Sequence, residues 1–307
     1  MELNNYEVDN QMDIYDYLSK PFKIDKPIRL IELFGGIGSQ AMALRNIGAN
    51  FEHYRLVEFD KYPVASYNAI HGTNFEPTDI TQINGSDLGI TEKDKYCYIM
   101  TYSFPCQDLS VAGKGAGMEK GSGTRSGLLW EVERLLDECE ELPQILLMEN
   151  VPQVHGKKNM EHFQKWIDFL ESKGYSNHWQ DLNAKNFGIP QNRNRCFMVS
   201  LFGNYTYEFP KPIPLTKTMK DFLEDEVDEK YYINSEKALK LIETLKENGS
   251  LVKDGVMYPN KECARQCIDL SINDHRPIEV ANCISARTDR GISNSKAEGS
   301  GIIEESR

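Results

Sequence analysis

The stretch IRLIELFGGIG, residues 28–38, decides the fold, because an apolar run ends there in closely spaced glycines. A helix-like segment, residues 40–47, follows at once and gives the order strand, glycine turn, helix. Glycines in such a turn let the backbone approach a ligand, and the helix N-terminus offers free N–H groups. Gly35, Gly36 and Gly38 do not match the G-x-G-x-x-G spacing of dinucleotide sites, so an adenosine-bearing cofactor without a pyrophosphate fits better. A tight turn that binds nothing is the alternative.

The same alternation of strand and helix continues along the chain. We predict strands at residues 28–34, 55–58, 95–102, 145–148, 176–182 and 196–202, and helices at 40–47, 61–70, 126–140 and 160–172. Strands that alternate with helices indicate a doubly wound α/β fold with a mostly parallel sheet. The last two strands have no helix between them, so we expect an antiparallel final strand.

The pattern breaks after Gly203, where prolines at 210, 212 and 214 precede an acidic stretch. This change predicts three parts: an N-terminal extension at 1–27, a main α/β domain at 28–205 and a smaller region at 206–307.

The composition is that of a globular protein, with 40% hydrophobic and 27% charged residues. No apolar run approaches the roughly 18 residues of a membrane span. The polar, acidic N-terminus does not read as a secretory signal, and seven irregularly spaced cysteines suggest free thiols in a reducing cytosol. The net charge of −12 argues mildly against a nucleic acid partner, although a basic cleft can lie within an acidic surface.

Polar residues follow several of the predicted strands. Phe34, Glu58, Cys106 and Glu149 each come after a strand that should end at the same edge of the sheet. An antiparallel final strand starts at that edge, so Gln191, Arg193 and Arg195 should face it too. Ligands of open α/β sheets bind beyond these strand ends, which makes this edge the predicted site.

Cys106 is a candidate nucleophile at this edge. Pro105 fixes its entry, and the glycine-dense stretch 113–123 beyond it could close over a ligand. A thiol needs a helix N-terminus or a nearby arginine to ionise readily at neutral pH. The alternative is a small buried residue, the usual fate of a free cysteine.

Glu149 is a candidate proton donor, because it follows the apolar run 145–148 and should be largely desolvated. A buried acid needs a partner, which Arg193 or Arg195 could supply. A structural ion pair is therefore the competing interpretation.

These motifs resemble those of the DNA cytosine-5 methyltransferases of bacterial or phage type, over roughly residues 28–205. The F-x-G-x-G motif stands at 34–38, Pro-Cys-Gln at 105–107, Glu-Asn-Val at 149–151 and Q-x-R-x-R at 191–195. The resemblance implies a Rossmann-like methyltransferase sheet with S-adenosyl-L-methionine as methyl donor, in a bacterial or phage-infected cell. The cofactor-binding residues that it implies are Phe34, Gly36, Gly38, Glu58, Asp79, Pro105 and Leu128. It implies no metal.

The resemblance also implies a mechanism. The Cys106 thiolate would add to carbon 6 of a cytosine flipped out of duplex DNA, which turns carbon 5 into a nucleophile for the methyl group. Glu149 would contact ring nitrogen 3, Arg195 would hold the exocyclic oxygen, and Arg193 would steady the loop or a phosphate.

Residues 206–307 would then carry target recognition through contacts to base edges. The segment 221–232 resembles the linker into that region, and Arg287 and Arg290 are candidates for DNA contact. A solvated loop is the alternative interpretation of both arginines.

The sequence departs from the family at its end, since the arginine-bearing and Gly-Asn motifs expected after the recognition region are not found before Arg307. We therefore expect a truncated homologue or a partner polypeptide that supplies these motifs, and weak cofactor binding and methylation by the chain alone.

Three other functions remain open from the sequence. RNA cytosine-5 methyltransferases carry a Cys-Phe-Thr signature, where this chain has only Cys196-Phe197-Met198, on a predicted strand. A catalytically silent DNA- or partner-binding module is a second alternative. A nicotinamide oxidoreductase is disfavoured by the glycine spacing.

Overall fold

The computed structural model describes residues 20–106, 108–109, 117–229, 236–247, 249, 252–253, 256–257, 265–269, 278–282 and 300–304. The chain divides into two compact units. The first contains the described residues up to Asp181 together with Arg195–Phe209, and the second contains Leu182–Asn194 and the described residues from Pro210 onward. Gln107, residues 110–116, Arg287 and Arg290 lie outside the described residues.

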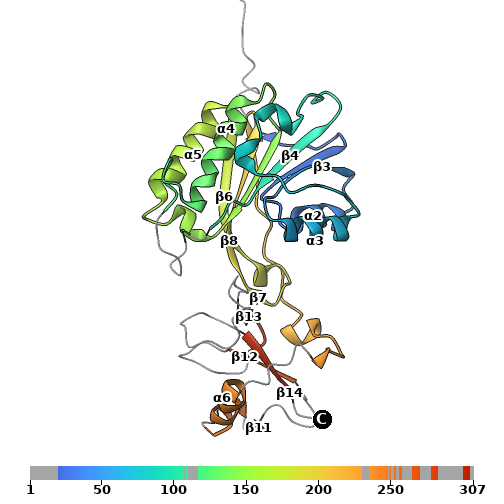
Figure 1. Cartoon of the computed structure of the whole chain (residues 1–307), viewed down its shortest axis with the longest axis vertical. Coiled ribbons are helices and arrows are strands. Elements are labelled where there is room, and N and C mark those ends of the chain that lie inside the picture. The colour runs from blue at the N-terminus through green and yellow to red at the C-terminus, as the bar shows by residue number, and fades with distance from the viewer. Residues whose placement is uncertain are drawn as a thin grey trace, which may run out of the picture. The chain divides into compact units, whose positions relative to one another are not determined.

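A six-stranded sheet forms the centre of the first unit (Figure 1). In spatial order its strands are β3 (Phe51–Val57), β2 (Ile28–Leu33), β4 (Cys97–Tyr102), β5 (Ile145–Asn150), β8 (Asn194–Phe202) and β6 (Tyr175–Asn183). β2 pairs in parallel with β3 and β4, β4 pairs in parallel with β5, and β8 is antiparallel to β5. The predicted α/β sheet with an antiparallel final strand is confirmed.

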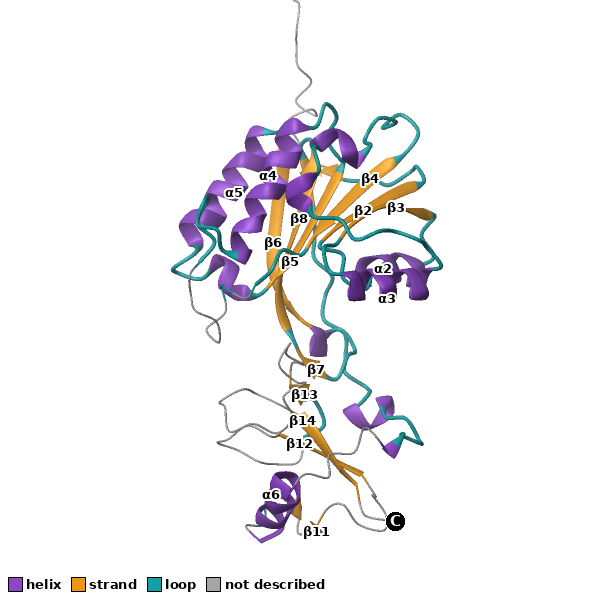
Figure 2. Ribbon diagram, in the orientation of Figure 1, coloured by secondary structure: helices purple, strands orange, loops and turns teal. Residues whose placement is uncertain are grey.

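Helices cover both faces of this sheet, with α2 (Ser39–Asn46) and α3 (Lys61–His71) on one side and α4 (Leu129–Glu138) and α5 (Met160–Ser172) on the other (Figure 2). Side chains alternate along β2 between these faces. Leu30 packs in a cluster with Ala41 of α2. Leu33 belongs to the larger cluster, which includes Leu135 of α4 and Trp166 of α5. The sheet is therefore buried on both faces, as its apolar sequences predict.

Four strands, β3, β5, β6 and β8, are longer than their hydrophobic patterns predict, and two of these extensions bear on the site. β3 begins at Phe51 rather than at residue 55, because it is the edge strand and tolerates polar residues such as Glu52. β5 continues past Met148 because Glu149 and Asn150 still pair with β8. The candidate acid therefore lies within the end of a strand rather than in the following loop.

Short elements complete the first unit. The predicted helix at 126–140 begins as the 3₁₀ turn η3 (Arg125–Leu128), which the Thr124 side chain caps by accepting from the Gly127 amide, and continues as α4. The other 3₁₀ turns are η1 (Ile80–Gln82), η2 (Gly85–Leu88) and η4 (Pro152–His155), and β1 (Lys20–Pro21) pairs in parallel with β9 (Tyr205–Thr206).

The second unit is built from short elements. Among its described residues these are η5 (Ala184–Asn186), η6 (Met219–Phe222), α6 (Glu236–Glu247) and three two-stranded pairs: β7 (Gln191–Asn192) with β13 (Ala281–Asn282), β10 (Val252–Lys253) with β11 (Val256–Met257), and β12 (Arg265–Asp269) with β14 (Ser300–Glu304). Leu245 of α6 and Ile268 of β12 form a small buried cluster.

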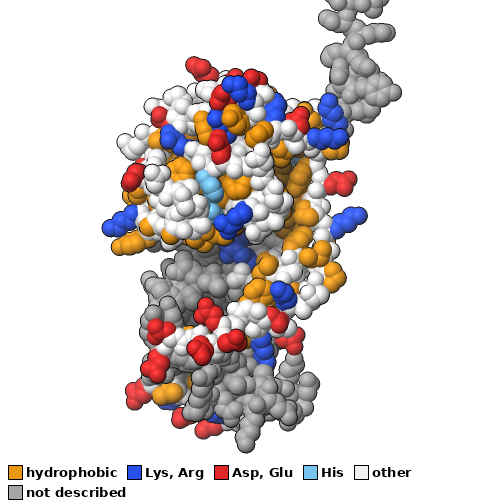
Figure 3. All heavy atoms as spheres, turned by 90° about the vertical axis from the view of Figure 1, so that its right-hand side faces the viewer, with side chains coloured by type: hydrophobic (Ala, Val, Ile, Leu, Met, Phe, Trp, Pro, Cys, Tyr) orange, Lys and Arg blue, Asp and Glu red, His pale blue; other side chains and the backbone are white. Residues whose placement is uncertain are grey.

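The acidic stretch 224–229 of this unit is exposed, as expected for a solvated segment, and acidic side chains are prominent on its described surface in Figure 3. Among the described parts of the chain, every helix is too short or too polar to cross a membrane.

Candidate active site

The strand pairing brings most of the predicted site residues to one edge of the first unit. Leu33 pairs with Val57 and with Tyr102, so β2, β3 and β4 end at the same level. Tyr102 pairs with Met148 of β5, and β8 starts at this edge because it is antiparallel. Phe34, Glu58, Cys106, Glu149 and Arg195 all lie at or just beyond these ends.

Glu149 and Arg195 form an ion pair at this edge. Arg195 Nε lies 3.0 Å from Glu149 Oε1, and the two side chains are only 17% and 21% exposed. Glu149 is directly opposite Phe197 in the ladder, and Arg195 points to the same face as Phe197 because it lies two residues away. The pairing of β5 with β8 therefore builds this contact, and partial burial leaves the two charges less screened by solvent and salt than those of an exposed pair.

The segment that carries Cys106 is held against the end of β5. Asn150 Nδ2 donates to the carbonyl oxygen of Phe104 at 2.9 Å, and Phe104 itself is buried. Ser126 Oγ donates to the carbonyl oxygen of Pro105 at 2.7 Å, so η3 holds the other side. These bonds fix the backbone on the N-terminal side of Cys106 next to the strand that carries Glu149.

Asp108 adds a third anchor, because its Oδ2 accepts from the backbone amide of Arg125 at 2.9 Å. Sequence reasoning missed the positioning roles of Asn150, Ser126 and Asp108. Their signal was present, since Asn150 follows Glu149 directly and Asp108 lies two residues after Cys106.

Cys106 differs from the cysteines of the hydrophobic core. It is half-buried, whereas Cys97 and Cys196 are buried. Desolvation raises the pKa of the Cys97 thiol to about 11 and that of Cys196 to about 12, which keeps both protonated at neutral pH. Such thiols are poor nucleophiles, so Cys106 is the better candidate for nucleophilic chemistry.

The glycine turn after β2 holds Glu58 by its backbone. Glu58 Oε2 accepts from the Gly36 amide at 3.1 Å, and Oε1 accepts from the Asp60 amide at 3.0 Å. Phe34 and Gly36 both adopt positive φ, of 56° and 55°. The strained turn thus presents a fixed carboxylate beside a half-buried aromatic ring.

Gly38 explains why the turn needs glycine. Its φ is 79°, and a Cβ atom there would collide with His71 and Tyr67 of α3. α2 can therefore begin close to α3 only if residue 38 has no side chain.

Asp79 is brought to the same region by a backbone bond, since the Thr78 amide donates to the Glu58 carbonyl oxygen at 2.8 Å. Asp79 Oδ1 accepts from the Thr81 amide and hydroxyl, each at 2.9 Å, which fixes its carboxylate. Two fixed carboxylates, an aromatic ring and a glycine backbone suit the hydroxyl and amino groups of an adenosine moiety, so these residues fit the cofactor that the sequence predicts.

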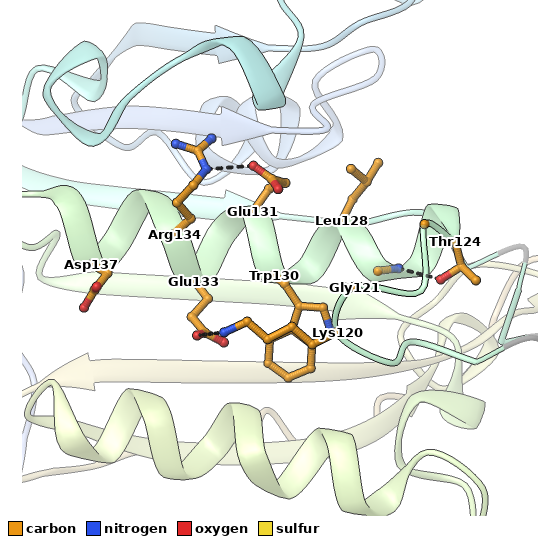
Figure 4. A pocket seen from close by; sticks show the side chains of 11 residues that line it. Lys120, Gly121, Thr124, Leu128, Trp130, Glu131, Glu133, Arg134 and Asp137 are labelled. Atoms are coloured by element: carbon orange, nitrogen blue, oxygen red, sulfur yellow. Dashed lines mark hydrogen bonds and ion pairs between the residues drawn. The ribbon is translucent and has the colours of Figure 1, made fainter.

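Leu128 packs against the large core cluster and also lines a hollow of about 640 Å³ along α4 (Figure 4). The hollow is otherwise lined by residues such as Lys120 and Glu133, which form a 2.5 Å ion pair across it, and Trp130. Neither Cys106 nor Glu58 lines it. Leu128 is the one predicted site residue among those that line this hollow, so we place the candidate active site at the strand ends.

Arg193 and Gln191 belong to the second unit, unlike Arg195. Gln191 lies in β7, opposite Ala281. Arg193 interrupts the expected alternation, because it lies between β7 and β8, where its amide donates to the Gln191 carbonyl oxygen at 3.0 Å. The edge described above thus contains one of the two arginines of the predicted pair.

The fold defines a class: a Rossmann-like α/β domain with a mostly parallel sheet. Solved structures share the fold. They include the Dnmt2 methyltransferase of S. pombe, with a TM-score of 0.54, 22% identity and coverage of 73% of this chain and 66% of that one. A Spodoptera frugiperda DNMT2 mutant gives a TM-score of 0.56 at 22% identity and covers 70% of this chain and 65% of that one.

The sequence comparisons identify the family. The model of the C-5 cytosine-specific DNA methylase family matches residues 28–303. Type II methyltransferase M2.ScrFI of Lactococcus lactis subsp. cremoris is 36% identical over 68% of this chain and 71% of its own length. Orphan methyltransferase M.SssI of Spiroplasma monobiae is 34% identical over 80% of this chain and 77% of its own length. The chain belongs to the C-5 cytosine-specific DNA methylase family.

Proposed function

We propose that this chain is a DNA (cytosine-5-)-methyltransferase that transfers a methyl group from S-adenosyl-L-methionine to carbon 5 of a cytosine flipped out of duplex DNA. The observation that supports this most strongly is the Glu149–Arg195 ion pair at the strand edge that also carries the Cys106 segment. Family membership supplies the reaction class. The position of a thiol, a carboxylate and a guanidinium at one edge of one sheet supports the proposed roles of nucleophile, acid and cation.

The proposed chemistry assigns each group a role at a stated atom. The Cys106 thiolate adds to carbon 6 of the ring, which makes carbon 5 electron-rich. Glu149 bonds ring nitrogen 3 and stabilises charge that develops there, and Arg195 both orients Glu149 and bonds the exocyclic oxygen. After methyl transfer, loss of the carbon 5 proton to a base expels the thiolate and restores the aromatic ring.

Phe34, Gly36, Gly38, Glu58, Asp79, Pro105 and Leu128 form the proposed cofactor site. Glu58 accepts from the ribose hydroxyls, and Asp79 accepts from the adenine amino group. The cofactor, when bound, supplies the methyl group. The chain's own contribution is a fixed set of hydrogen-bond acceptors, held by backbone amides before the cofactor arrives.

We propose that the second unit recognises the target sequence and that Arg193, at the junction of β7 and β8, bonds a DNA phosphate. Contacts to base edges would set sequence choice, whereas phosphate contacts would set orientation.

The test is methyl transfer from isotope-labelled S-adenosyl-L-methionine to duplex DNA by the full chain, followed by nucleoside analysis. We expect label in 5-methylcytosine with the wild-type chain and none with Cys106→Ala. A Cys139→Ala variant, which removes a half-buried thiol hydrogen-bonded to the Gly85 carbonyl oxygen, should retain transfer. Binding of DNA without any label transfer would favour the silent module, and label in RNA alone would favour an RNA methyltransferase.

A further inference from the structure

Three potential metal ligands that have no role in the proposed catalysis converge in the first unit. They are His155 at the end of η4, Asp181 in β6 and Cys196 in β8, and their ligand atoms all lie within 4.8 Å of one another. His155 Nε2 lies 2.9 Å from Asp181 Oδ1. The three residues come from different elements, so the fold itself creates this cluster.

The surroundings of the cluster hold its histidine in place. The His155 ring packs against Trp179 at a centroid distance of 4.8 Å and against Phe163 at 6.2 Å. Cys196 is fully buried, whereas the side chains of His155 and Asp181 are 21% and 31% exposed. The cluster is therefore closed on the sulfur side and open to solvent on the other, which gives an ion an entry path.

We propose that His155, Asp181 and Cys196 bind one zinc ion, with water in the fourth position. One nitrogen, one oxygen and one sulfur ligand suit zinc, whereas calcium and magnesium prefer oxygen ligands alone. In a tetrahedral zinc site, neighbouring ligand atoms lie about 3.4–3.7 Å apart, given the usual zinc–ligand bond lengths. His155 and Asp181 would separate slightly from their hydrogen-bonded distance, and both would move toward the sulfur.

Zinc binding at this site requires the Cys196 thiol to lose its proton. Burial, with Asp181 and Glu149 nearby, raises the pKa of the Cys196 thiol to about 12, so the metal-free cysteine carries its proton. Zinc binding would form the metal–sulfur bond and release that proton to solvent, because a coordinated thiol is deprotonated. Zinc affinity should therefore increase with pH.

The site lies behind the proposed catalytic pair rather than within it. Cys196 follows Arg195 directly on β8 and so points to the opposite face of the sheet. Its ladder partner is Asn150, whose side chain holds the Cys106 segment. An ion at this position would fasten η4, β6 and β8 together and stabilise the first unit.

Sequence reasoning indicated no metal, because the ligands do not form a local motif. His155 and Asp181 are separated by 26 residues, unlike the short spacings of zinc motifs. Cys196 also fits the hydrophobic pattern of its strand, so nothing in the sequence marks it as a ligand.

Titration of the metal-stripped full chain with Co²⁺, a spectroscopic substitute for zinc, tests the proposal. We expect one equivalent to bind with a thiolate-to-cobalt charge-transfer band that Zn²⁺ abolishes, and Zn²⁺ to raise the Tm. Cys196→Ser should lose the band. His155→Gln, a change at a partly exposed position, should weaken binding at least about 10-fold and leave the fold intact. Cys106→Ser, which removes the half-buried thiol at the strand edge, should retain the band.

Three results would overturn the zinc site. They are a wild-type chain without a thiolate band, a band that survives in His155→Gln with unchanged affinity, and a band lost in Cys106→Ser but kept in Cys196→Ser. If Cys196→Ser fails to fold, the His155→Gln and Cys106→Ser titrations still decide the question. None of these readouts depends on methyl transfer.

Discussion

The two sides of the candidate active site hold their carboxylates in different ways. On the β2–β3 side, backbone amides of Gly36 and Asp60 fix Glu58. On the β5–β8 side, the side chain of Arg195 holds Glu149. A backbone-held acid is fixed by the turn itself, whereas a side-chain pair depends on two residues from distant parts of the sequence. Substitutions should therefore affect binding and stability on the first side and turnover on the second.

Glu149→Gln should produce the largest effect of the substitutions considered. The amide keeps the size of the side chain but cannot donate or accept a proton in the same way, so we expect kcat to fall by about 10²–10⁴. DNA affinity, measured by fluorescence anisotropy at fixed salt, should change by no more than a few fold. A matched loss of affinity and turnover would instead give Glu149 a structural role and remove the contrast between the two sides.

Gly38→Ala should destabilise the β2–β3 side of the site, because the added side chain has no room. A side chain there must adopt a φ of 79° and collide with His71 and Tyr67, so we expect a loss of about 3 kcal/mol in the free energy of unfolding. Gly48→Ala is the control, because its φ is 70° but a Cβ atom would meet nothing within 4 Å. This variant should lower the free energy of unfolding by about 1 kcal/mol. Equal losses in urea denaturation would show that the close approach of α2 and α3 does not matter.

Glu32 extends the β2–β3 side into the core. It is fully buried, Tyr67 Oη donates to its Oε2 at 2.6 Å, and Tyr67 in turn contacts His53 Nδ1 at 2.6 Å. Burial raises the pKa of the Glu32 carboxyl from 4.5 to about 7, although the Tyr67 hydroxyl acts in the opposite direction. Between these values the folded chain keeps a proton that the unfolded chain has lost.

This pKa shift predicts a pH-dependent stability. The contribution of Glu32 is fully present below pH 4.5 and falls by about 3 kcal/mol as the pH rises to about 7, then stays constant. Glu32→Gln keeps an acceptor for Tyr67 and removes the titration, so it should flatten the curve across this window. Wild-type and variant unfolding curves that stay parallel from pH 5 to pH 8 would contradict the assignment.

Glu58→Gln should have the smallest of these effects. The amide nitrogen of glutamine would face the Gly36 or the Asp60 amide, donor against donor, and one acceptor for the ribose would be lost. We expect the KM for S-adenosyl-L-methionine to rise about 10-fold, equivalent to one hydrogen bond, with kcat largely kept. Glu76→Gln, at an exposed acid, is the control. A fall in kcat with unchanged KM would show that Glu58 acts in turnover and not in cofactor binding, which would contradict the contrast between the two sides.

The sequence predicted the sheet because its buried strands carry long apolar runs, and the glycine turn because few residues tolerate positive φ. It predicted that Glu149 lies near an arginine, because an antiparallel final strand starts at the edge where the parallel strands end. It did not predict that β5 continues through Asn150, since that depends on pairing with β8, a long-range contact. Arg193 and Arg195 do not share one strand, because the strand structure is interrupted at residue 193, and no periodicity in the sequence marks this interruption.

The cluster of His155, Asp181 and Cys196 was not predicted either, because it also depends on long-range contacts. Which residues meet across β6, β8 and η4 depends on how the strands pair, whereas a hydrophobic pattern shows only which face of its own strand a side chain occupies. Capping and anchoring side chains such as Ser126 were missed because their partners are backbone carbonyl groups of another segment.

Covalent trapping on duplex DNA that contains 5-fluorocytosine tests the central claim most directly. Fluorine at carbon 5 blocks the final elimination, so the wild-type chain with S-adenosyl-L-methionine should form a stable adduct whose peptide map places the DNA on Cys106. Cys106→Ala should form none, and Glu149→Gln should form it much more slowly. An adduct on another cysteine, or no adduct under conditions where the chain binds both DNA and cofactor, would contradict the account.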